Sequence, residues 1–416
     1  MSRKRHRPVK WRLEWLAQCS IERLFTLLPG RVVFRLGEWL GLAVWHLVPE
    51  RRRTLRKNLR IVFAGARTKD EIDAMARTTC MRIGANLASA LRTARIPAEE
   101  LLASVTMENP ELLHDAVKDG RGLVLLPPHM GNWELLSRIN PFYPAGHPCG
   151  ALFRPLNNPL LNARVKHQRE SEGTRLFSKR DSLHHITGFL RDGGILGVLA
   201  DQRAGLQGRL AVFFGRLTRA TPLPELLVRR CKAAALAVSI RTSSAGNWTL
   251  KFHEVNPPYD TQACALAIES AMRESLCDVF WMHDRWRIYL GRGRTIQQWL
   301  GDGSSQQDRR HRALLWIEDV PADWTIPDEW NHQDVDYEVV LPPHQSLPEA
   351  LAGLPLHSLE RTPEGWRDIR RILRKIDAGR PLPIDFLLAP SQFPKGISRA
   401  CKREAIAFTC IRASRV

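Results

Sequence analysis

Residues 122–134 read Gly-Leu-Val-Leu-Leu-Pro-Pro-His-Met-Gly-Asn-Trp-Glu. The apolar run at 122–126, bounded by glycine and proline, predicts a short buried strand. His129 follows that strand closely, and Gly131 permits a tight turn before a helix that we expect to begin near Asn132. In a parallel α/β sheet the chemistry gathers at the carboxyl ends of the strands. The pattern therefore places His129 where a functional side chain would lie.

The same alternation continues from about residue 120 to 255. Further strands are predicted at 150–153, 195–199, 236–240 and 248–252, and helices at 133–140, 158–171, 182–192 and 222–233. Strands that alternate with helices predict an α/β domain with a largely parallel sheet. A capping-box sequence at 68–71, followed by apolar residues at helical spacing, predicts a further helix at 69–93.

The charge of the chain is concentrated near its start. The 416 residues carry a formal charge of +19, and residues 1–60 alone hold 15 basic and 4 acidic residues. Residues 301–416 have a net charge of −1. A basic excess of this size indicates an anionic partner, and its concentration favours an attachment surface over a uniformly basic nucleic-acid binder. The eight cysteines have no metal-ligand spacing and are expected to be reduced thiols.

The first 60 residues combine apolar and basic faces. Trp11, Trp15 and Trp39 lie in runs with helical spacing, and the triplet Arg51-Arg52-Arg53 follows. No run is long enough for an ordinary spanning helix. Such helices are typical of segments that lie in the plane of a membrane, where arginines meet anionic headgroups. The alternative is a helical hairpin packed on the enzyme core, with its arginines in solvent.

The residue types around His129 fit acid–base chemistry. Glu134 lies five positions on and could bond one imidazole nitrogen, which would fix the tautomer while the other nitrogen takes a proton. The start of the expected helix could favour a developing oxyanion. A structural histidine after a strand is the alternative that the residues alone leave open.

Several segments resemble one known family. His129-Met130-Gly131-Asn132-Trp133-Glu134 resembles the H-x4-D/E motif of the lysophospholipid acyltransferase superfamily, in the form typical of bacterial late acyltransferases of lipid A biosynthesis. Further segments resemble that family in order and spacing, over about residues 10 to 300. They are Arg51-Arg52-Arg53 with Asn58-Leu59, Phe153-Arg154-Pro155 with Asn158-Pro159-Leu160, Asp201-Gln202, Phe213-Phe214-Gly215 with Ala220-Thr221, and Trp281-Met282-His283 with Arg285-Trp286.

The resemblance implies transfer of a fatty acyl chain from a thioester to a hydroxyl of a lipid A precursor. It implies His129 as general base and Glu134 as the residue that orients it. The thioester is already activated, so no metal and no cofactor are expected. The implied donor is acyl-carrier protein, although acyl-CoA is also an anion and charge cannot separate the two. The implied location is the cytoplasmic face of the cell inner membrane, as a peripheral or monotopic protein with no nucleic-acid partner.

Four residues are expected to contact substrate: Arg154, Asn132, Asp201 and Arg285. Arg154 could pair with an acceptor phosphate or stabilise the oxyanion. Asp201 could bond Arg154 or shape the pocket. Arg285 could meet phosphate or form a salt bridge within the fold.

We expect three segments: membrane-associating helices at 1–60, an acyltransferase domain at 61–300, and a small α/β module at 301–416. In the last, strands are predicted at 312–317, 337–341 and 385–388, and a helix at 364–376. Residues 383–393 faintly resemble the N-terminal Rossmann half of lipopolysaccharide heptosyltransferases, which would make the module a truncated, non-catalytic half. Two alternative functions remain: acylation of another glycolipid or aminolipid, and a catalytically silent membrane scaffold of the same fold.

Overall fold

The chain forms two compact units. The structure is a computed structural model that describes residues 8–64, 66–178, 181–205, 207–286, 295–300, 310–390 and 395–411. The first unit comprises the described residues of 1–59, 69–202 and 222–283, and the second those of 60–68, 203–221 and 284–416. This division differs from the three predicted segments, because the N-terminal helices belong to the first unit and residues 203–221 to the second.

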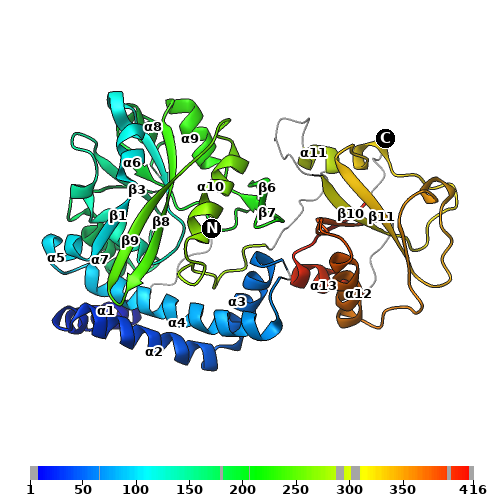
Figure 1. The fold of residues 1–416 in the computed structure, drawn as a ribbon, viewed down its shortest axis with the longest axis horizontal. Helices are drawn as coiled ribbons and strands as arrows, with labels where there is room; N and C mark the ends of the chain where they lie inside the picture. The colour runs from blue at the N-terminus through cyan, green and yellow to red at the C-terminus, as the bar shows by residue number, and fades with distance from the viewer. Residues whose placement is uncertain are drawn as a thin grey trace. The chain divides into compact units, whose positions relative to one another are not determined.

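A seven-stranded sheet forms the centre of the first unit, in the order β1-β9-β8-β2-β5-β3-β4 (Figure 1). Its strands are β1 (Val105–Glu108), β2 (Leu123–Leu126), β3 (Cys149–Phe153), β4 (Arg175–Ser178), β5 (Ile195–Gly197), β8 (Ala234–Ser244) and β9 (Asn247–Glu254). Every neighbouring pair is parallel except β8 with β9. The prediction of a largely parallel α/β sheet is therefore confirmed. All four residues of β2, the strand before His129, are buried, as its uninterrupted apolar sequence requires.

Helices flank this sheet. They are α5 (Ala98–Ala103), α6 (Pro110–Val117), α7 (Pro159–Glu170), α8 (Leu183–Arg191), α9 (Leu223–Cys231) and α10 (Thr261–Arg273). Short 3₁₀ helices are η1 (Lys118–Gly120), η2 (Trp133–Ser137) and η3 (Asn140–Phe142). The helix predicted at 133–140 is thus wrong in type: η2 ends at Ser137, and Pro141 in η3 cannot continue an α-helix.

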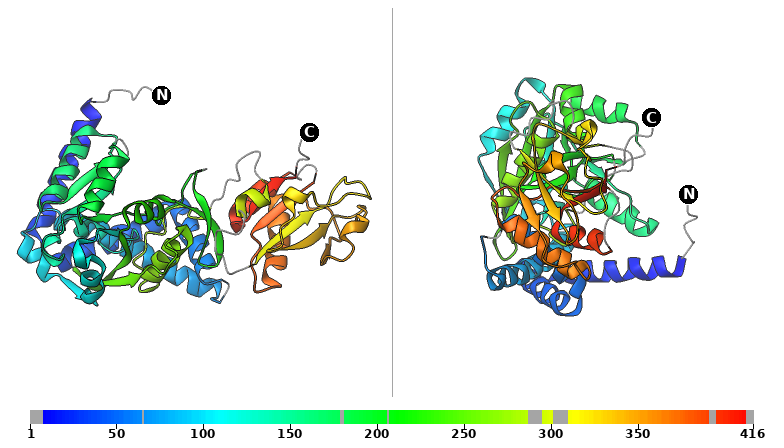
Figure 2. Two further views of the ribbon diagram at one scale, coloured as in Figure 1. Left: turned by 90° about the horizontal axis from the view of Figure 1, so that it is seen from above. Right: turned by 90° about the vertical axis from the view of Figure 1, so that its right-hand side faces the viewer.

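The N-terminal helices of the first unit are α1 (Pro8–Leu27), α2 (Gly30–Leu47), α3 (Pro49–Val62) and α4 (Lys69–Thr93); α3 ends in the second unit. Small residues let α2 pack closely on α4. A Cβ on Gly41 would lie 2.3 Å from the carbonyl oxygen of Cys80, and one on Gly84 would lie 2.3 Å from that of Gly37. Figure 2 shows α1 beside α7, where Asn158 donates to the carbonyl oxygen of Trp11. Among the described residues, no helix is long and apolar enough to cross a membrane.

The second unit is built on a five-stranded parallel sheet in the order β12-β11-β10-β13-β14. Its strands are β10 (His311–Trp316), β11 (Val335–Leu341), β12 (Leu356–Ser358), β13 (Phe386–Ala389) and β14 (Ala407–Cys410). The order, with the first strand central, is that of a doubly wound half-domain. Its helices are α11 (Ile296–Leu300), α12 (Trp366–Ala378) and α13 (Ile397–Glu404), with 3₁₀ helices η4 (Asp328–Trp330) and η5 (Glu349–Leu351). The strands and the helix predicted for this module are all present.

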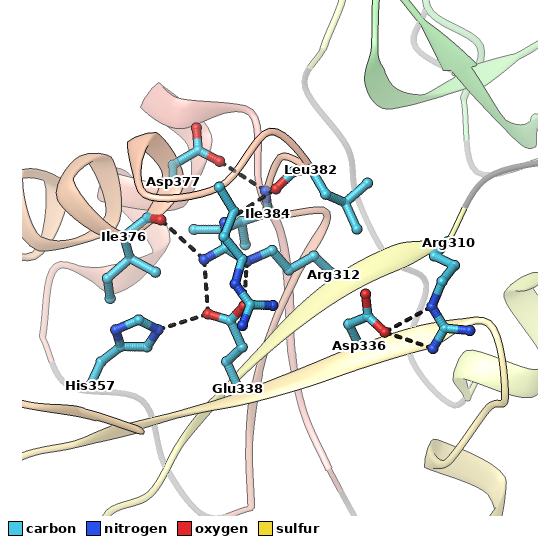
Figure 3. Close-up of polar contacts among 10 residues, drawn as sticks. Arg310, Arg312, Asp336, Glu338, His357, Ile376, Asp377, Leu382 and Ile384 are labelled. Atoms are coloured by element: carbon cyan, nitrogen blue, oxygen red, sulfur yellow. Dashed lines mark hydrogen bonds and ion pairs between the residues drawn. The ribbon is translucent and has the colours of Figure 1, made fainter. Parts of the chain in front are cut away.

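A buried ionic cluster joins the first two strands of the module (Figure 3). Arg312 on β10 makes two hydrogen bonds of 2.8 Å to the carboxylate of Glu338 on β11, and both side chains are almost fully buried. His357 bonds the same carboxylate at 2.7 Å, and Arg380 lies 2.9 Å from it. The carboxylate is therefore fully surrounded by cationic and hydrogen-bonding partners.

The hairpin of β6 (Arg209–Phe213) and β7 (Arg216–Ala220) contains a segment that resembles the acyltransferase family, yet it packs in the second unit. Leu217 is buried in one core with β10 and β13. The guanidinium of Arg216 donates to the carbonyl oxygen of Ile384 and pairs with Asp377. The segments that resemble the family therefore lie in both units.

Candidate active site

The backbone around His129 is held on both sides. The amide of Gly131 donates to the carbonyl oxygen of Asp278 at 2.9 Å, and the amide of Phe280 donates to that of His129 at 2.8 Å. Gly131 has a φ of +56°, and a Cβ there would lie 2.1 Å from the carbonyl oxygen of Ile240. Only glycine fits this position, which fixes the path of the chain directly after His129.

Asp201, and not Glu134, bonds the imidazole of His129. The Nδ1 atom of His129 lies 2.7 Å from Oδ1 of Asp201, whose side chain is fully buried, while the imidazole side chain keeps 21% of its exposure. The amide nitrogen of Gln202 lies 3.3 Å from Nε2 on the other side of the ring. An amide N–H can only donate to an unprotonated Nε2, so the proton of the neutral ring sits on Nδ1 and is donated to Asp201.

The positive charge of protonated His129 and the negative charge of Asp201 stabilise each other. Burial alone would lower the pKa of His129, but the charge and hydrogen bond of Asp201 outweigh it and raise that pKa above its usual value. Burial would likewise raise the pKa of Asp201, and the charge and hydrogen bond of His129 instead hold it below its usual value. The pair can therefore accommodate a protonated imidazole, as a general base needs after it takes a proton.

Glu134 binds an arginine. Its two carboxylate oxygens accept hydrogen bonds of 2.8 and 2.7 Å from Arg169 on α7, and both side chains are about one third exposed. The expected hydrogen bond between His129 and Glu134 is absent, because this ion pair turns the carboxylate toward α7. The negative charge of Glu134 still favours protonation of His129, and the charge of Arg169 opposes it. Glu134 thus fixes η2 against α7.

Asn132 is buried and lies against α4. Its Nδ2 donates to the hydroxyl of Thr93 at 2.9 Å, and its Oδ1 has no hydrogen-bond partner among the described residues. The structure therefore gives Asn132 a position inside the fold. The oxyanion role expected for a helix start at this point loses its basis, because η2 is a five-residue 3₁₀ helix.

Arg154 lies directly after β3 and is exposed, with no hydrogen bond or ion pair to any described residue. β2, β5 and β3 are neighbours in the sheet, so His129, Asp201 and Arg154 all follow the carboxyl ends of adjacent parallel strands. The expected bond between Asp201 and Arg154 is absent, since Asp201 bonds His129. Asn158, in the same sequence block, caps α7 by accepting from the amides of Leu160 and Leu161.

Arg285 belongs to the second unit, where its side chain is buried. It donates to the hydroxyl of Thr218 at 2.8 Å and to the carbonyl oxygen of Arg219 at 3.0 Å, and it stacks over Phe213. Of the two roles expected for it, contact within the fold is the one observed. Across the described stretches of the chain, no three His, Cys, Asp or Glu side chains gather in a way that could hold a metal ion.

Sequence reasoning gave no role to two residues of the site, Arg169 and Gln202. Arg169 carries no local signal, because it is one of several basic residues on α7. Gln202 was visible only as the neighbour of Asp201. The contact between Asp201 and His129 had a usable signal: each follows a predicted strand, and adjacent parallel strands end at the same edge.

Comparison with known proteins identifies the family. No curated protein matches the chain. The crystal structure of the 1-acyl-sn-glycerophosphate (LPA) acyltransferase PlsC from Thermotoga maritima is 12% identical over 59% of this chain and 94% of that chain, with a TM-score of 0.27. The sequence profile of the bacterial lipid A biosynthesis acyltransferases matches residues 1–288, which is more than half of the chain. The protein therefore belongs to the bacterial lipid A biosynthesis acyltransferase family.

Proposed function

We propose that this protein transfers a fatty acyl chain from acyl-carrier protein to a hydroxyl of a lipid A precursor, with His129 as the general base. The observation that carries the proposal is the bond between His129 Nδ1 and Asp201. It leaves the lone pair of Nε2 available to a substrate hydroxyl once the amide of Gln202 gives way. The chain belongs to a family of lipid acyltransferases, and its His129 is oriented and partly exposed. Both observations support general-base catalysis of acyl transfer.

In the proposed reaction, the acceptor hydroxyl attacks the thioester carbonyl and gives its proton to Nε2 of His129. The resulting imidazolium is stabilised by the buried carboxylate of Asp201. The tetrahedral intermediate then collapses, the carbon–sulfur bond breaks, and the leaving thiolate takes the proton back from Nε2. Arg154, at the same edge of the sheet and with no partner in the described part of the chain, supplies positive charge for the oxyanion or for an acceptor phosphate.

The proposed location is the cytoplasmic face of the inner membrane. α1 exposes Val9, Leu13, Leu16, Leu24 and Leu27, whose spacing puts them along one side of the helix. α2 exposes Trp39, which is 70% accessible, beside a groove of about 430 Å³. The groove is lined by Arg31, Val32, Arg35, Leu36, Trp39 and Ala245. A lining of apolar side chains together with two arginines suits the boundary between acyl chains and anionic headgroups.

The test uses the full-length purified protein, an under-acylated lipid A precursor, and acyl-carrier protein or CoA carrying the same chain. Mass spectrometry should show an added acyl ester that depends on both substrates, at a higher rate with acyl-carrier protein. A folded protein that acylates only a different lipid, or that forms no product with either donor, would overturn the proposal.

A further inference from the structure

Residues 301–416 have a net charge near zero, but acidic and basic residues are concentrated in different stretches of this part of the second unit. Residues 310–365 carry 3 basic and 11 acidic residues, whereas residues 366–404 carry 10 basic and 4 acidic residues. The two stretches therefore differ in net charge by 14, from −8 to +6. The basic stretch contains α12 and α13, the two helices that pack together on one face of the five-stranded sheet.

These two helices present their basic side chains to solvent. Ile369, Leu373, Ala400 and Cys401 are buried in one core with Leu314 of β10. The opposite side carries the exposed residues Arg367, Arg371, Arg374, Lys375 and Arg399, which we call the basic face. α12 and α13 lie side by side (Figure 1), so these side chains belong to one surface of the second unit.

An excess of positive charge is built in beneath this surface. The carboxylate of Glu404 is 3.0 Å from Arg60 and 3.1 Å from Arg374, and it is also bonded by Arg370. One negative charge thus serves three arginines. Burial, together with the charges of Arg374, Arg370 and Arg216, lowers the pKa of Arg60 to about 10 despite Glu404. The arrangement keeps the site electropositive and favours an anion from outside.

We propose that the basic face of the second unit is a docking surface for an anionic lipid bilayer, separate from the apolar side chains of α1 and α2. Basic residues near an anionic membrane are attracted electrostatically without inserting. The choice of a bilayer rests on the proposed function, in which the acceptor is a membrane lipid.

The composition of the face favours a bilayer over a macromolecular partner. A stable protein interface is centred on apolar or aromatic side chains, whereas Leu356 on β12 is the one exposed large apolar residue among those described in the second unit. Binding of single-stranded nucleic acid uses open aromatic rings. The ring of Trp366 is covered by Arg399, whose guanidinium carbon lies 4.4 Å from its centroid, and also meets Arg367.

The test measures binding of the full-length protein to phosphatidylcholine vesicles with and without phosphatidylglycerol. Arg367, Arg371 and Lys375 follow one side of α12 at four-residue spacing, and none of them bonds Glu404. A variant carrying Arg367→Gln, Arg371→Gln and Lys375→Gln removes three charges from the face. The matched control, Lys118→Gln with Arg230→Gln and Lys232→Gln, removes three exposed charges from the first unit. A third variant, Arg367→Lys with Arg371→Lys, keeps the charge.

At low salt, the first variant should bind phosphatidylglycerol-containing vesicles on the order of 100-fold more weakly than the wild type, and the difference should shrink at high salt. The lysine variant and the control should bind within about threefold of the wild type. Equal losses in the first variant and the control would overturn the proposal, as would wild-type binding that is indifferent to phosphatidylglycerol. Selective loss of binding to RNA or to an acidic protein, with vesicle binding intact, would also overturn it.

Acyl transfer to a detergent-dispersed acceptor separates this inference from the proposed function. All variants should retain wild-type rates in that assay, because none of the substituted residues lies in the active site. Loss of vesicle binding with retained transfer supports the docking surface. A wild type that binds through this face and transfers no acyl chain would contradict the proposed function alone.

Discussion

Asp201 and His129 are 72 positions apart in the chain, yet their side chains meet at 2.7 Å because the strands that precede them are neighbours in a parallel sheet. β2 delivers His129 and β5 delivers Asp201 to the same edge. Glu134, the carboxylate of the sequence motif, instead pairs with Arg169 and so joins η2 to α7. The proposed acid–base pair is thus a long-range contact.

Replacing His129 with alanine should remove the base and leave the fold intact. His129 is partly exposed, and its neighbours are held by backbone hydrogen bonds that the substitution does not touch. We expect the rate of acyl transfer to fall by about 10² to 10⁴. The measurement is a steady-state rate at matched folding, judged by circular dichroism. A folded variant with nearly normal turnover would show that another group takes the proton.

Arg154→Gln should weaken catalysis without loss of stability, because Arg154 has no partner among the residues that the structure describes. We expect kcat/KM to fall by roughly 10- to 100-fold, as the loss of one charge-assisted contact implies. An acceptor with and an acceptor without its phosphate should separate the two roles of the arginine. If the defect disappears with the phosphate-free acceptor, Arg154 binds phosphate; an equal defect with both assigns it to the oxyanion. Unchanged kinetics with both acceptors would exclude Arg154 from the site.

Glu338→Gln should destabilise the second unit, because it leaves Arg312 buried beside a neutral partner (Figure 3). We expect a loss of about 3–5 kcal/mol in the free energy of unfolding, and a far smaller loss for Asp336→Asn in the exposed pair with Arg310. Hydrogen exchange of peptides from β10 and β11 measures the loss of stability in each of the two variants. Equal protection in the two variants would show that the buried pair contributes no more than the exposed one.

The difference in the free energy of unfolding between wild type and Glu338→Gln should depend on pH. Burial would raise the pKa of Glu338, but its hydrogen bonds to Arg312 and His357 outweigh this and lower it. A carboxyl with a depressed pKa stabilises the fold above its unfolded pKa of about 4.3 and loses that effect as the pH falls through the folded value. The gap between wild type and Glu338→Gln should therefore narrow below about pH 4.

Most elements of both sheets could be predicted, because their apolar runs are short, uninterrupted and bounded by glycine or proline. The strands at 123–126 and 386–389 are of this kind and are buried along their whole length. Edge strands such as β12, with its exposed Leu356, carry no such run and were not predicted. Residues 209–220 fall within the predicted segment 61–300, whereas the hairpin that they form packs in the second unit beside β10 and β13, through contacts distant in sequence.

The site was predictable only in part, because a motif identifies residues that are close in sequence but not their long-range partners. A local motif identified His129 and Glu134 but could not fix which carboxylate bonds the imidazole. That choice depends on sheet order and on a competing cation, Arg169, and neither is encoded within the motif. Arg285 shows the converse limit. Its sequence neighbours suggest a ligand site, but it is buried and donates to the carbonyl oxygen of Arg219 and the hydroxyl of Thr218, which gives it a structural role.

The most direct test of the account compares the pH dependence of kcat/KM for wild type, Asp201→Asn and Glu134→Gln. The base must be neutral to act, so activity falls below the pKa of His129, which Asp201 raises. Without that carboxylate, burial lowers the pKa of His129. Asp201→Asn should therefore move the acid limb to lower pH and cut the rate by roughly 10²-fold or more. Glu134→Gln should move the limb in the same direction by less. A larger shift in Glu134→Gln than in Asp201→Asn would contradict the assignment of Asp201 as the partner of the base.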